Sequence, residues 1–475
     1  MEVNAGDYYS SPGDSFAFTV SVISRLTPDV KLEKISINKW DTLPEATVKK
    51  NEVWSMSKKL VLDKQTLYSN PYWLNQEHEP GMYKIADASK TGEPWNTDFP
   101  EAILQLNFSG EVLNFTVPVT HKWTDPVRGE LYRPFEVLPA ISINPSEMLL
   151  IFTEAANKTL NVLVKSLGDS VSGSLKINPP AGWSVIPGSY DVSFDIKGGE
   201  KSFDFVVIPP KAGKHDTSKN NSLEITFETK NATYNQRITR ITYDHIPPLV
   251  RISSSNVKLV NVDLKSTAKK IGYIEGAGDD VARCLEQAGF DVTLLDDHLI
   301  RNTSLAQYDA IVTGIRAYNT IDRMDAWYAP LMKYIENGGN LIVQYNTSNF
   351  ISSINSPVGP YPFKITRDRV TVENAPVEFQ DPSHFLLNSP NKITKDDFGG
   401  WIQERGLYFA GEPAPEYKSV LSMSDPGEKA NSGSLIIAQK GKGYFIYTGI
   451  SFFRQLPAGV PGAYRLMTNL LNAGK

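Results

Sequence analysis

The sequence has few of the residues that build metal and thiol sites. Among its 475 residues are one cysteine and six histidines, so an internal disulfide and a cysteine-based zinc centre are excluded. The histidines form no His-x-x-His or His-Pro-Asp-Asp cluster, which argues against a zinc hydrolase centre. We therefore expect neither a metal nor a cofactor in this chain.

The chain also lacks a strong charge of either sign and long hydrophobic runs. Its 48 basic and 53 acidic residues give a net charge of -5, which is unlike the basic surface of a nucleic-acid-binding protein. No run approaches about 18 apolar residues, so no transmembrane helix is expected. No signal-peptide pattern follows Met1. The 41% of hydrophobic residues is typical of a folded protein.

The first 266 residues are predicted to form two antiparallel β-sandwiches. Apolar and polar residues alternate in short runs, such as 16–22, 102–108 and 159–164, and turn residues separate these runs. A proline-bearing link begins near Pro134. We therefore expect one sandwich over residues 1–133 and an immunoglobulin-like sandwich over residues 134–266.

From residue 267 onward, strands are predicted to alternate with helices. Buried strands are expected at 271–274, 290–295, 308–313 and 340–345, with helices from Asp279 and over 324–335 between them. Such alternation is typical of a doubly wound parallel sheet. We therefore expect an α/β domain over residues 267–475.

Candidate ligand residues follow the strands of this sheet, because open parallel sheets bind ligands beyond the carboxyl ends of their strands. Glu275 follows the first strand and Arg316 the third. The long segment 356–411 is expected to cover the same crevice. The full set of candidates is Glu275, Arg316, Tyr345, Asn346, Tyr361, Arg367, Arg369, Trp401, Glu404 and Arg405. Aromatic and guanidinium groups suit sugar hydroxyls or a carboxylated glycan. The alternative is that these groups satisfy one another and only hold the segment in place.

No catalytic residue is predicted. Gly276-Ala277-Gly278 follows a strand, but Val281 stands where a dinucleotide motif has its third glycine. Cys284 lies inside a predicted helix beside its apolar face, so we expect it to be buried and inert. His384 has no acid two residues later to orient it as the base of a triad.

Four stretches of the sequence resemble long bacterial deacetylases of the PIG-L/LmbE type. They are residues 119–137, 359–370, 401–409 and 449–465, of which the last is the most specific. The resemblance implies two β-sandwiches, the second of a type associated with sugar-binding modules. It also implies a final flavodoxin-like domain, similar to class I glutamine amidotransferases and trehalose-utilisation proteins. The zinc deacetylase domain of the family is missing from this chain, so no catalytic residue carries over.

The resemblance thus implies the non-catalytic accessory region of a periplasmic or secreted N-acetylglucosaminyl de-N-acetylase. Its partners would be a carbohydrate or glycoconjugate and a deacetylase domain upstream in the parent chain. Two alternatives remain open at this point. The last domain could process a sugar, with Glu275, His384 or Glu404 as acid or base, or the chain could be a structural scaffold without a ligand.

Overall fold

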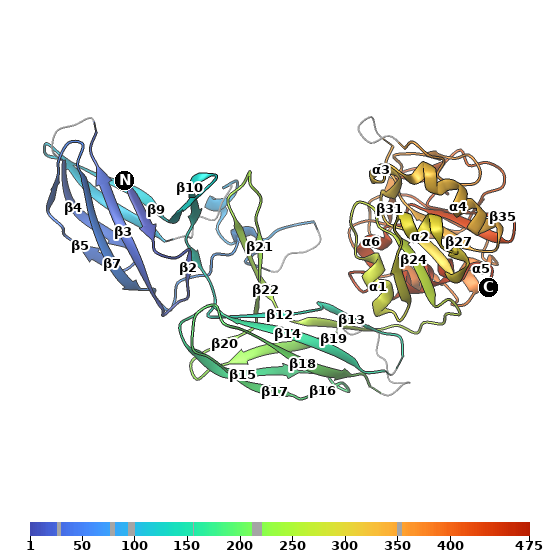
Figure 1. Cartoon of the computed structure of the whole chain (residues 1–475), viewed down its shortest axis with the longest axis horizontal. Coiled ribbons are helices and arrows are strands. Elements are labelled where there is room, and N and C mark those ends of the chain that lie inside the picture. Colours follow the sequence, from blue (N-terminus) through green and yellow to red (C-terminus); the bar gives the residue numbers. More distant parts are fainter. Residues whose placement is uncertain (26–29, 77–80, 94–99, 155, 211–220, 349–353) are drawn as a thin grey trace. The chain divides into compact units, whose positions relative to one another are not determined.

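The computed structural model describes residues 1–475 except 26–29, 77–80, 94–99, 155, 211–220 and 349–353 (Figure 1). The protein is mostly β, with 43% of its residues in strands and 14% in helices. The chain divides into two compact units. Unit 1 comprises Met1–Met148, Asn157–Ile208 and Ser222–Val257, and unit 2 comprises Leu149–Ala156, Pro209–Asn221 and Lys258–Lys475.

The N-terminal part of unit 1 is a β-sandwich made by one sheet that folds over its longest strand. That strand, β9 (Glu111–Asp125), pairs with β8 (Glu101–Phe108) through its first half and with β1 (Glu2–Ala5) and β10 (Gly129–Pro134) through its second. The other strands are β3 (Ser15–Ile23), β4 (Val30–Ile37), β5 (Trp40–Thr42), β6 (Ala46–Val48) and β7 (Val53–Val61). Alternate residues of β3 and β4 meet in the core between the two halves.

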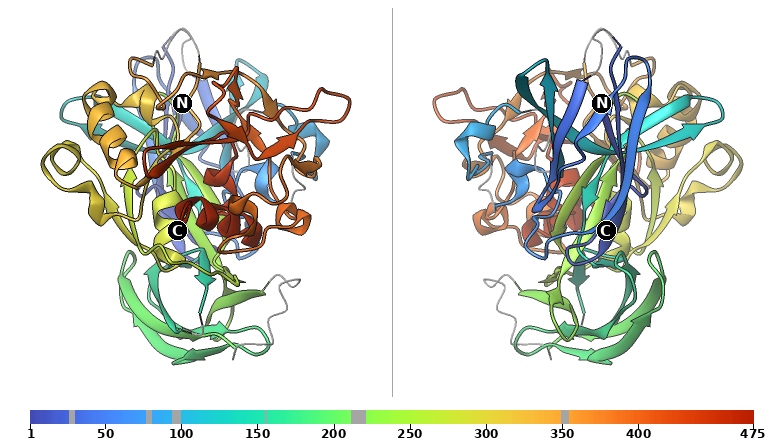
Figure 2. Two further views of the ribbon diagram at one scale, coloured as in Figure 1. Left: turned by 90° about the vertical axis from the view of Figure 1, so that its right-hand side faces the viewer. Right: turned by 90° about the vertical axis from the view of Figure 1, so that its left-hand side faces the viewer.

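The second part of unit 1 is an immunoglobulin-like β-sandwich, and its two facing sheets are visible in the turned views of Figure 2. One sheet has the order β12-β14-β18-β16, and β15 lies between β17 and β19 in the other. Their bounds are β12 Ile141–Pro145, β14 Lys158–Ser166, β15 Val171–Asn178, β16 Ser184–Ile186, β17 Ser189–Phe194, β18 Glu200–Ile208 and β19 Asn221–Glu228. The β-sandwich and immunoglobulin-like character expected from the alternating pattern is confirmed, whereas the boundaries at residues 133 and 266 stay predictions.

A buried ionic cluster holds part of unit 1 together. Glu136 of β11 (Glu136–Val137) is 2% exposed. Its carboxylate accepts hydrogen bonds from Arg133 Nη2 at 2.5 Å and from Arg240 Nη2 at 3.0 Å. The Arg133 guanidinium also lies 4.0 Å from the centre of the Tyr8 ring. Removing the carboxylate leaves two largely buried cations without their counter-charge.

We expect Glu136→Ala to lower the free energy of unfolding by about 3–5 kcal/mol, because it breaks a buried ion pair on one side only. Chemical denaturation measures this change. Glu200→Ala is the matched control, since Glu200 forms an exposed pair with Lys165 and its loss should cost at most about 1 kcal/mol. Equal losses of unfolding free energy for the two variants would contradict the conclusion that Glu136 belongs to a buried ionic cluster.

Unit 2 is built on a seven-stranded mixed sheet of order β25-β24-β26-β27-β36-β35-β33. Five strands run parallel, and β35 and β33 are antiparallel to their neighbours at one edge. The strands are β24 Lys270–Ile274, β25 Asp291–Leu294, β26 Ala310–Thr313, β27 Asn340–Gln344, β33 Lys418–Ser419, β35 Leu435–Lys440 and β36 Gly443–Thr448. The helices are α1 Val281–Gln287, α2 Asp297–Asn302, α3 Ala317–Thr320, α4 Met324–Glu336, α5 Phe385–Asn388, α6 Phe452–Gln455 and α7 Pro461–Leu471.

The prediction of a flavodoxin-like, amidotransferase-like doubly wound parallel sheet after the two sandwiches is wrong. The sheet is mixed, and among the described residues only α4 and α7 have more than ten residues. Between Lys364 and Met423 the chain forms three small antiparallel pairs. They are β28 (Lys364–Ile365) with β32 (Ala410–Gly411), β29 (Arg369–Val370) with β31 (Gly406–Leu407), and β30 (Val377–Phe379) with β34 (Leu421–Met423). Antiparallel neighbours need only short turns, whereas each further parallel strand needs a crossover of a dozen or more residues. No helix of the described residues is long and apolar enough to cross a membrane.

Helix α7 packs against the rest of unit 2 through a glycine. A Cβ atom at Gly462 would lie 1.9 Å from the backbone oxygen of Asp397. Asp397 also accepts a hydrogen bond from Arg465 Nε, one turn further along α7, at 2.8 Å. The close approach therefore needs a residue without a side chain at this position.

We expect Gly462→Ala to lower the free energy of unfolding by about 2 kcal/mol, because the added methyl group overpacks the contact. In an exposed helix the same replacement of glycine by alanine raises the free energy of unfolding by about 1 kcal/mol, so the expected change has the opposite sign. Urea denaturation measures the difference. Gly188→Ala is the control, since a Cβ there meets no atom within 4 Å, and a stabilised Gly462→Ala variant would refute the contact.

Candidate functional site

The loops after β24 and β26 are held together by one carboxylate, that of Asp279. Its Oδ1 accepts hydrogen bonds from Tyr273 Oη at 2.5 Å and from the Val281 amide at 3.0 Å. Its Oδ2 accepts one from the Ile315 amide at 2.9 Å. Gly276 lets the loops touch, because a Cβ there would lie 2.1 Å from the Ile315 oxygen. These contacts fix the backbone that leads into Arg316.

Arg316 is held in an uncommon conformation at the end of β26. Its φ angle is 57°, in the left-handed region, which costs a residue with a side chain about 1–2 kcal/mol. Its amide donates a hydrogen bond to the Tyr345 oxygen at 2.8 Å. Among the described residues, its buried Nε atom has no hydrogen-bond partner.

An aromatic platform adjoins Arg316. The ring of Tyr345, which follows β27, stacks on that of Tyr408, with centroids 5.6 Å apart and planes inclined by 10°. Phe453 of α6 lies 5.3 Å from Tyr345. Tyr345 is buried, whereas Tyr408 and Phe453 are partly exposed. Burial raises the pKa of the Tyr345 phenol, and the positive charges of Arg316 and Arg454 oppose this rise.

Charged groups flank the platform. Arg454 donates a hydrogen bond from Nε to Glu404 Oε1 at 2.7 Å and another from Nη1 to the side chain of Gln403. Its guanidinium lies 4.8 Å from the centre of the Phe453 ring. Gln403 and Tyr408 have φ angles of 64° and 54°, so they share the left-handed conformation of Arg316.

We call this group of residues the strand-end cluster. It consists of Arg316, Tyr345, Gln403, Glu404, Tyr408, Phe453 and Arg454. It combines a stacked aromatic pair with guanidinium, carboxylate and amide groups.

Two of the predicted strand-end residues have other positions. Glu275 is exposed, and the ion pairs of the described residues do not include one between Glu275 and Arg316. Asn346 is fully buried. Its Oδ1 accepts a hydrogen bond from the Tyr318 amide at 2.9 Å, and its Nδ2 donates one to the Gln344 oxygen at 3.0 Å. Asn346 therefore orders the backbone beneath the cluster.

Trp401 and Arg405 order the inside of the segment 356–411, because their side-chain hydrogen bonds go to other residues of that segment. The Trp401 indole donates a hydrogen bond to the Asp397 oxygen at 2.9 Å. Arg405 is 4% exposed and donates to the backbone oxygens of Ala375, at 2.9 and 3.1 Å, and of Phe398. Burial lowers the pKa of Arg405 to about 10. Backbone oxygens thus satisfy this cation.

The remaining three candidates lie outside the cluster. Tyr361 donates a hydrogen bond to the Gln439 oxygen at 3.3 Å and lines a separate pocket of about 590 Å³. Arg367 and Arg369 are exposed, and Arg367 Nε donates to the Ser348 oxygen at 3.4 Å. In the described part of the chain, the Tyr361 ring contacts Tyr417, and the Tyr345–Tyr408 pair is formed without these three residues.

Sequence reasoning missed Gln403, Tyr408, Phe453 and Arg454. Gln403 and Tyr408 lie in the long segment, and Phe453 and Arg454 lie in α6, more than 100 residues after Tyr345. The resembling stretch 401–409 contains Gln403 and Tyr408, and the stretch 449–465 contains Phe453 and Arg454, so the resemblance was an available signal for all four.

Cys284 and His384 have structural roles. Cys284 is buried, as expected, and burial raises the pKa of its thiol to about 12. His384 accepts a hydrogen bond at Nδ1 from the Leu386 amide at 3.2 Å and so caps α5. Burial lowers the pKa of His384, against the opposing charge of Asp381. Among the described residues, no three His, Cys, Asp or Glu side chains are placed to hold a metal ion.

We expect His384 to make the protein less stable in mild acid. Because its pKa is lowered in the folded state, the unfolded chain takes up a proton first as the pH falls through about 6.5, and this favours unfolding. Urea denaturation between pH 7.5 and 5.5 measures the loss. His384→Asn, which retains a capping oxygen, should lose less stability over this range, whereas the exposed control His298→Asn should behave like the parent protein.

No family model matches the chain, and no curated protein matches it. Among solved structures, the periplasmic chaperone SfaE is 15% identical over 25% of this chain and 57% of its own, with a TM-score of 0.16. A protein of unknown function from Porphyromonas gingivalis W83 is 10% identical over 55% of this chain and 96% of its own, with a TM-score of 0.15. A family 123 glycoside hydrolase from Clostridium perfringens is 9% identical over 43% and 38%, with a TM-score of 0.15. Likenesses this weak support no statement about function.

Proposed function

We propose that this chain is a non-catalytic region that binds carbohydrate, and that the strand-end cluster is its glycan site. The stacked Tyr345–Tyr408 pair, with Arg316 and Arg454 beside it, carries the proposal. The apolar face of a sugar ring packs on aromatic rings, while guanidinium and carboxylate groups satisfy its hydroxyls. Partial exposure of Tyr408, Phe453 and Arg454 leaves these groups open to a ligand.

Backbone strain in the cluster supports a binding role. Arg316, Gln403 and Tyr408 all have positive φ angles, and each such residue costs of order 1–3 kcal/mol. Strained residues of this kind gather at ligand sites, where the surrounding contacts hold them in place. The unpartnered Nε of Arg316 provides a donor that a small rearrangement on binding would satisfy.

The resemblance to PIG-L/LmbE-type deacetylases suggests which protein this region serves. An accessory region with a glycan site would hold an N-acetylated glycan near a deacetylase domain of the parent chain. Under this proposal, the protein works in the periplasm or outside the cell, where such glycans lie. The ion pair between Arg454 and Glu404 is what the scaffold alternative predicts, so the experiment below is designed to separate that alternative from glycan binding.

The experiment is a glycan-array screen followed by calorimetry with the best ligand. Tyr408→Asn removes the ring but keeps a residue that tolerates positive φ, and we expect it to weaken binding at least tenfold. Arg454→Ala should weaken binding by about 1–3 kcal/mol, the cost of an unmade hydrogen bond at a partly buried site. Tyr243→Ala, which removes an exposed tyrosine of unit 1, is the matched control.

Thermal melts of the same variants separate binding from scaffolding. A glycan site predicts that the parent protein binds a glycan and that Arg454→Ala lowers this affinity, with a fall in melting temperature no larger than the lost pair with Glu404 causes. A structural scaffold predicts the reverse, with a lower melting temperature and no glycan bound by the parent protein. That second pattern would refute the proposal.

A further inference from the structure

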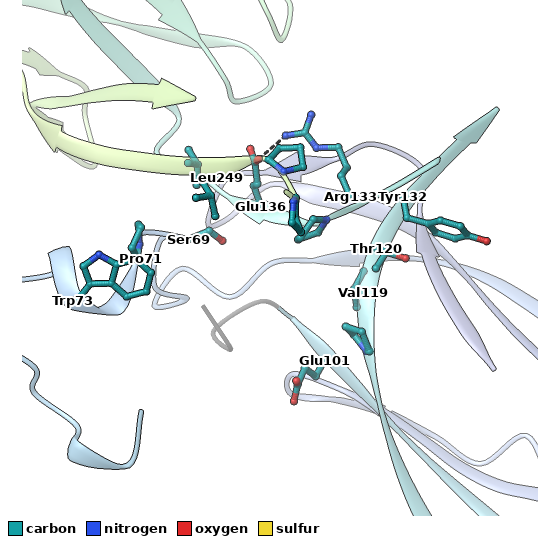
Figure 3. Close-up of a pocket in the computed structure, with 15 residues that line it drawn as sticks. Ser69, Pro71, Trp73, Glu101, Val119, Thr120, Tyr132, Arg133, Glu136 and Leu249 are labelled. Carbon is teal, nitrogen blue, oxygen red and sulfur yellow. Dashed lines mark hydrogen bonds and ion pairs between the residues drawn. The ribbon is translucent and has the colours of Figure 1, made fainter. Parts of the chain in front are cut away.

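Unit 1 contains a second candidate site, a pocket of about 400 Å³ with mostly apolar walls (Figure 3). Trp73 and Pro71 form one side of it, and Pro247, Pro248 and Leu249 from the turn before and start of β22 (Leu249–Ser254) line another. Its volume lies within the range of about 300–1,000 Å³ that is typical of small-molecule sites. The strand-end cluster lies in unit 2, so the two sites are separate.

Hydrogen bonds from side chains hold the walls of the pocket in position. The loop that carries Trp73 is tied down at two neighbouring residues. Ser69 Oγ accepts a hydrogen bond from the Val137 amide at 2.8 Å, and Asn70 Oδ1 accepts one from the Ile252 amide at 2.8 Å. The Asn70 side chain also donates to the Leu74 oxygen at 3.1 Å, directly after Trp73. The entropic cost of ordering these walls when a ligand binds is therefore small.

The walls offer few hydrogen-bonding groups to a ligand. Five of the lining residues are prolines, which have no amide hydrogen to donate. Arg133 and Glu136 also line the pocket, but they are paired with each other. A molecule rich in hydroxyls would lose its hydration without replacement here. A flat apolar body would instead pack between the Trp73 indole and the proline rings.

One charged group at the pocket is available. Glu101, at the start of β8, lines the pocket and is exposed. Its carboxylate has no hydrogen bond or ion pair with any residue that the structure describes. The Glu136 carboxylate is already bound by two guanidinium groups, those of Arg133 and Arg240. Among the described residues, Glu101 is thus a lining carboxylate without a partner, and the Trp73 indole, whose face attracts cations, lines the same pocket.

We propose that this pocket binds a small organic amine with a flat apolar body, such as an arylalkylamine. The apolar body packs on Trp73, Leu249 and the prolines, and the ammonium group pairs with Glu101. The proposal does not depend on the glycan site, because the two ligands differ in polarity and the two sites share no residue.

The experiment compares four probes on the full chain by calorimetry and saturation-transfer NMR. Tryptamine carries the ammonium group, indole-3-acetate the opposite charge and tryptophol no charge, while N-acetylglucosamine tests a sugar. We expect tryptamine to bind most tightly, tryptophol at least threefold more weakly, and the other two not to bind. Tighter binding of indole-3-acetate, or of N-acetylglucosamine, would overturn the proposal.

Variants then locate the site. Trp73→Ala should weaken tryptamine binding at least tenfold, and Glu101→Gln should weaken tryptamine at least threefold while tryptophol is unaffected. Trp123→Ala removes a tryptophan that is 37% exposed and outside the pocket, and it should leave binding unchanged. Leu249→Trp fills the pocket and should abolish binding. It tests the site independently if Trp73→Ala lowers the melting temperature of the protein. Binding that survives in a folded Leu249→Trp variant would place the amine elsewhere and refute the proposal.

Discussion

The carboxylate of Asp279 is the contact on which the strand-end cluster depends. It accepts the Tyr273 hydroxyl and two backbone amides, and so joins the loops after two neighbouring parallel strands. Such charge-assisted hydrogen bonds are stronger than neutral ones. With Gly276 pressed against the Ile315 oxygen, they leave the next residue, Arg316, little freedom. Its strained backbone and its bond to Tyr345 follow from that restriction.

The two candidate sites present different chemical groups to a ligand. The strand-end cluster places guanidinium, carboxylate and amide groups around stacked rings, a mixture that suits a polar ligand with an apolar face. The pocket of unit 1 has proline walls, an indole and a carboxylate, that of Glu101, without a partner in the described part of the chain, which suit a compact apolar cation. In both sites the backbone is held by side-chain hydrogen bonds from residues that do not themselves face the ligand, such as Asn346 and Asn70.

Only part of the fold could be predicted from local patterns in the sequence. The strands expected at 271–274 and 340–345 and the helix at 324–335 are present, because buried runs and a 3.6-residue period are local properties. The prediction of a doubly wound parallel sheet was wrong, because the direction of β35 and the pairing of β28 with β32 depend on partners that are distant in the sequence. Register and strand direction are set by tertiary contacts, which no window of sequence contains.

By itself, the sequence determined the β-rich character of the first half, the burial of Cys284 and the position of Arg316 and Tyr345 at strand ends. These follow from residue type and short-range periodicity. Only the tertiary structure decided that Tyr408 and Arg454 join them, that Trp401 and Arg405 serve packing, and that Pro247 meets Trp73 in a pocket. The reason is physical: each of these contacts joins residues far apart in the chain, and their hydrogen bonds form only once the core has brought those segments together.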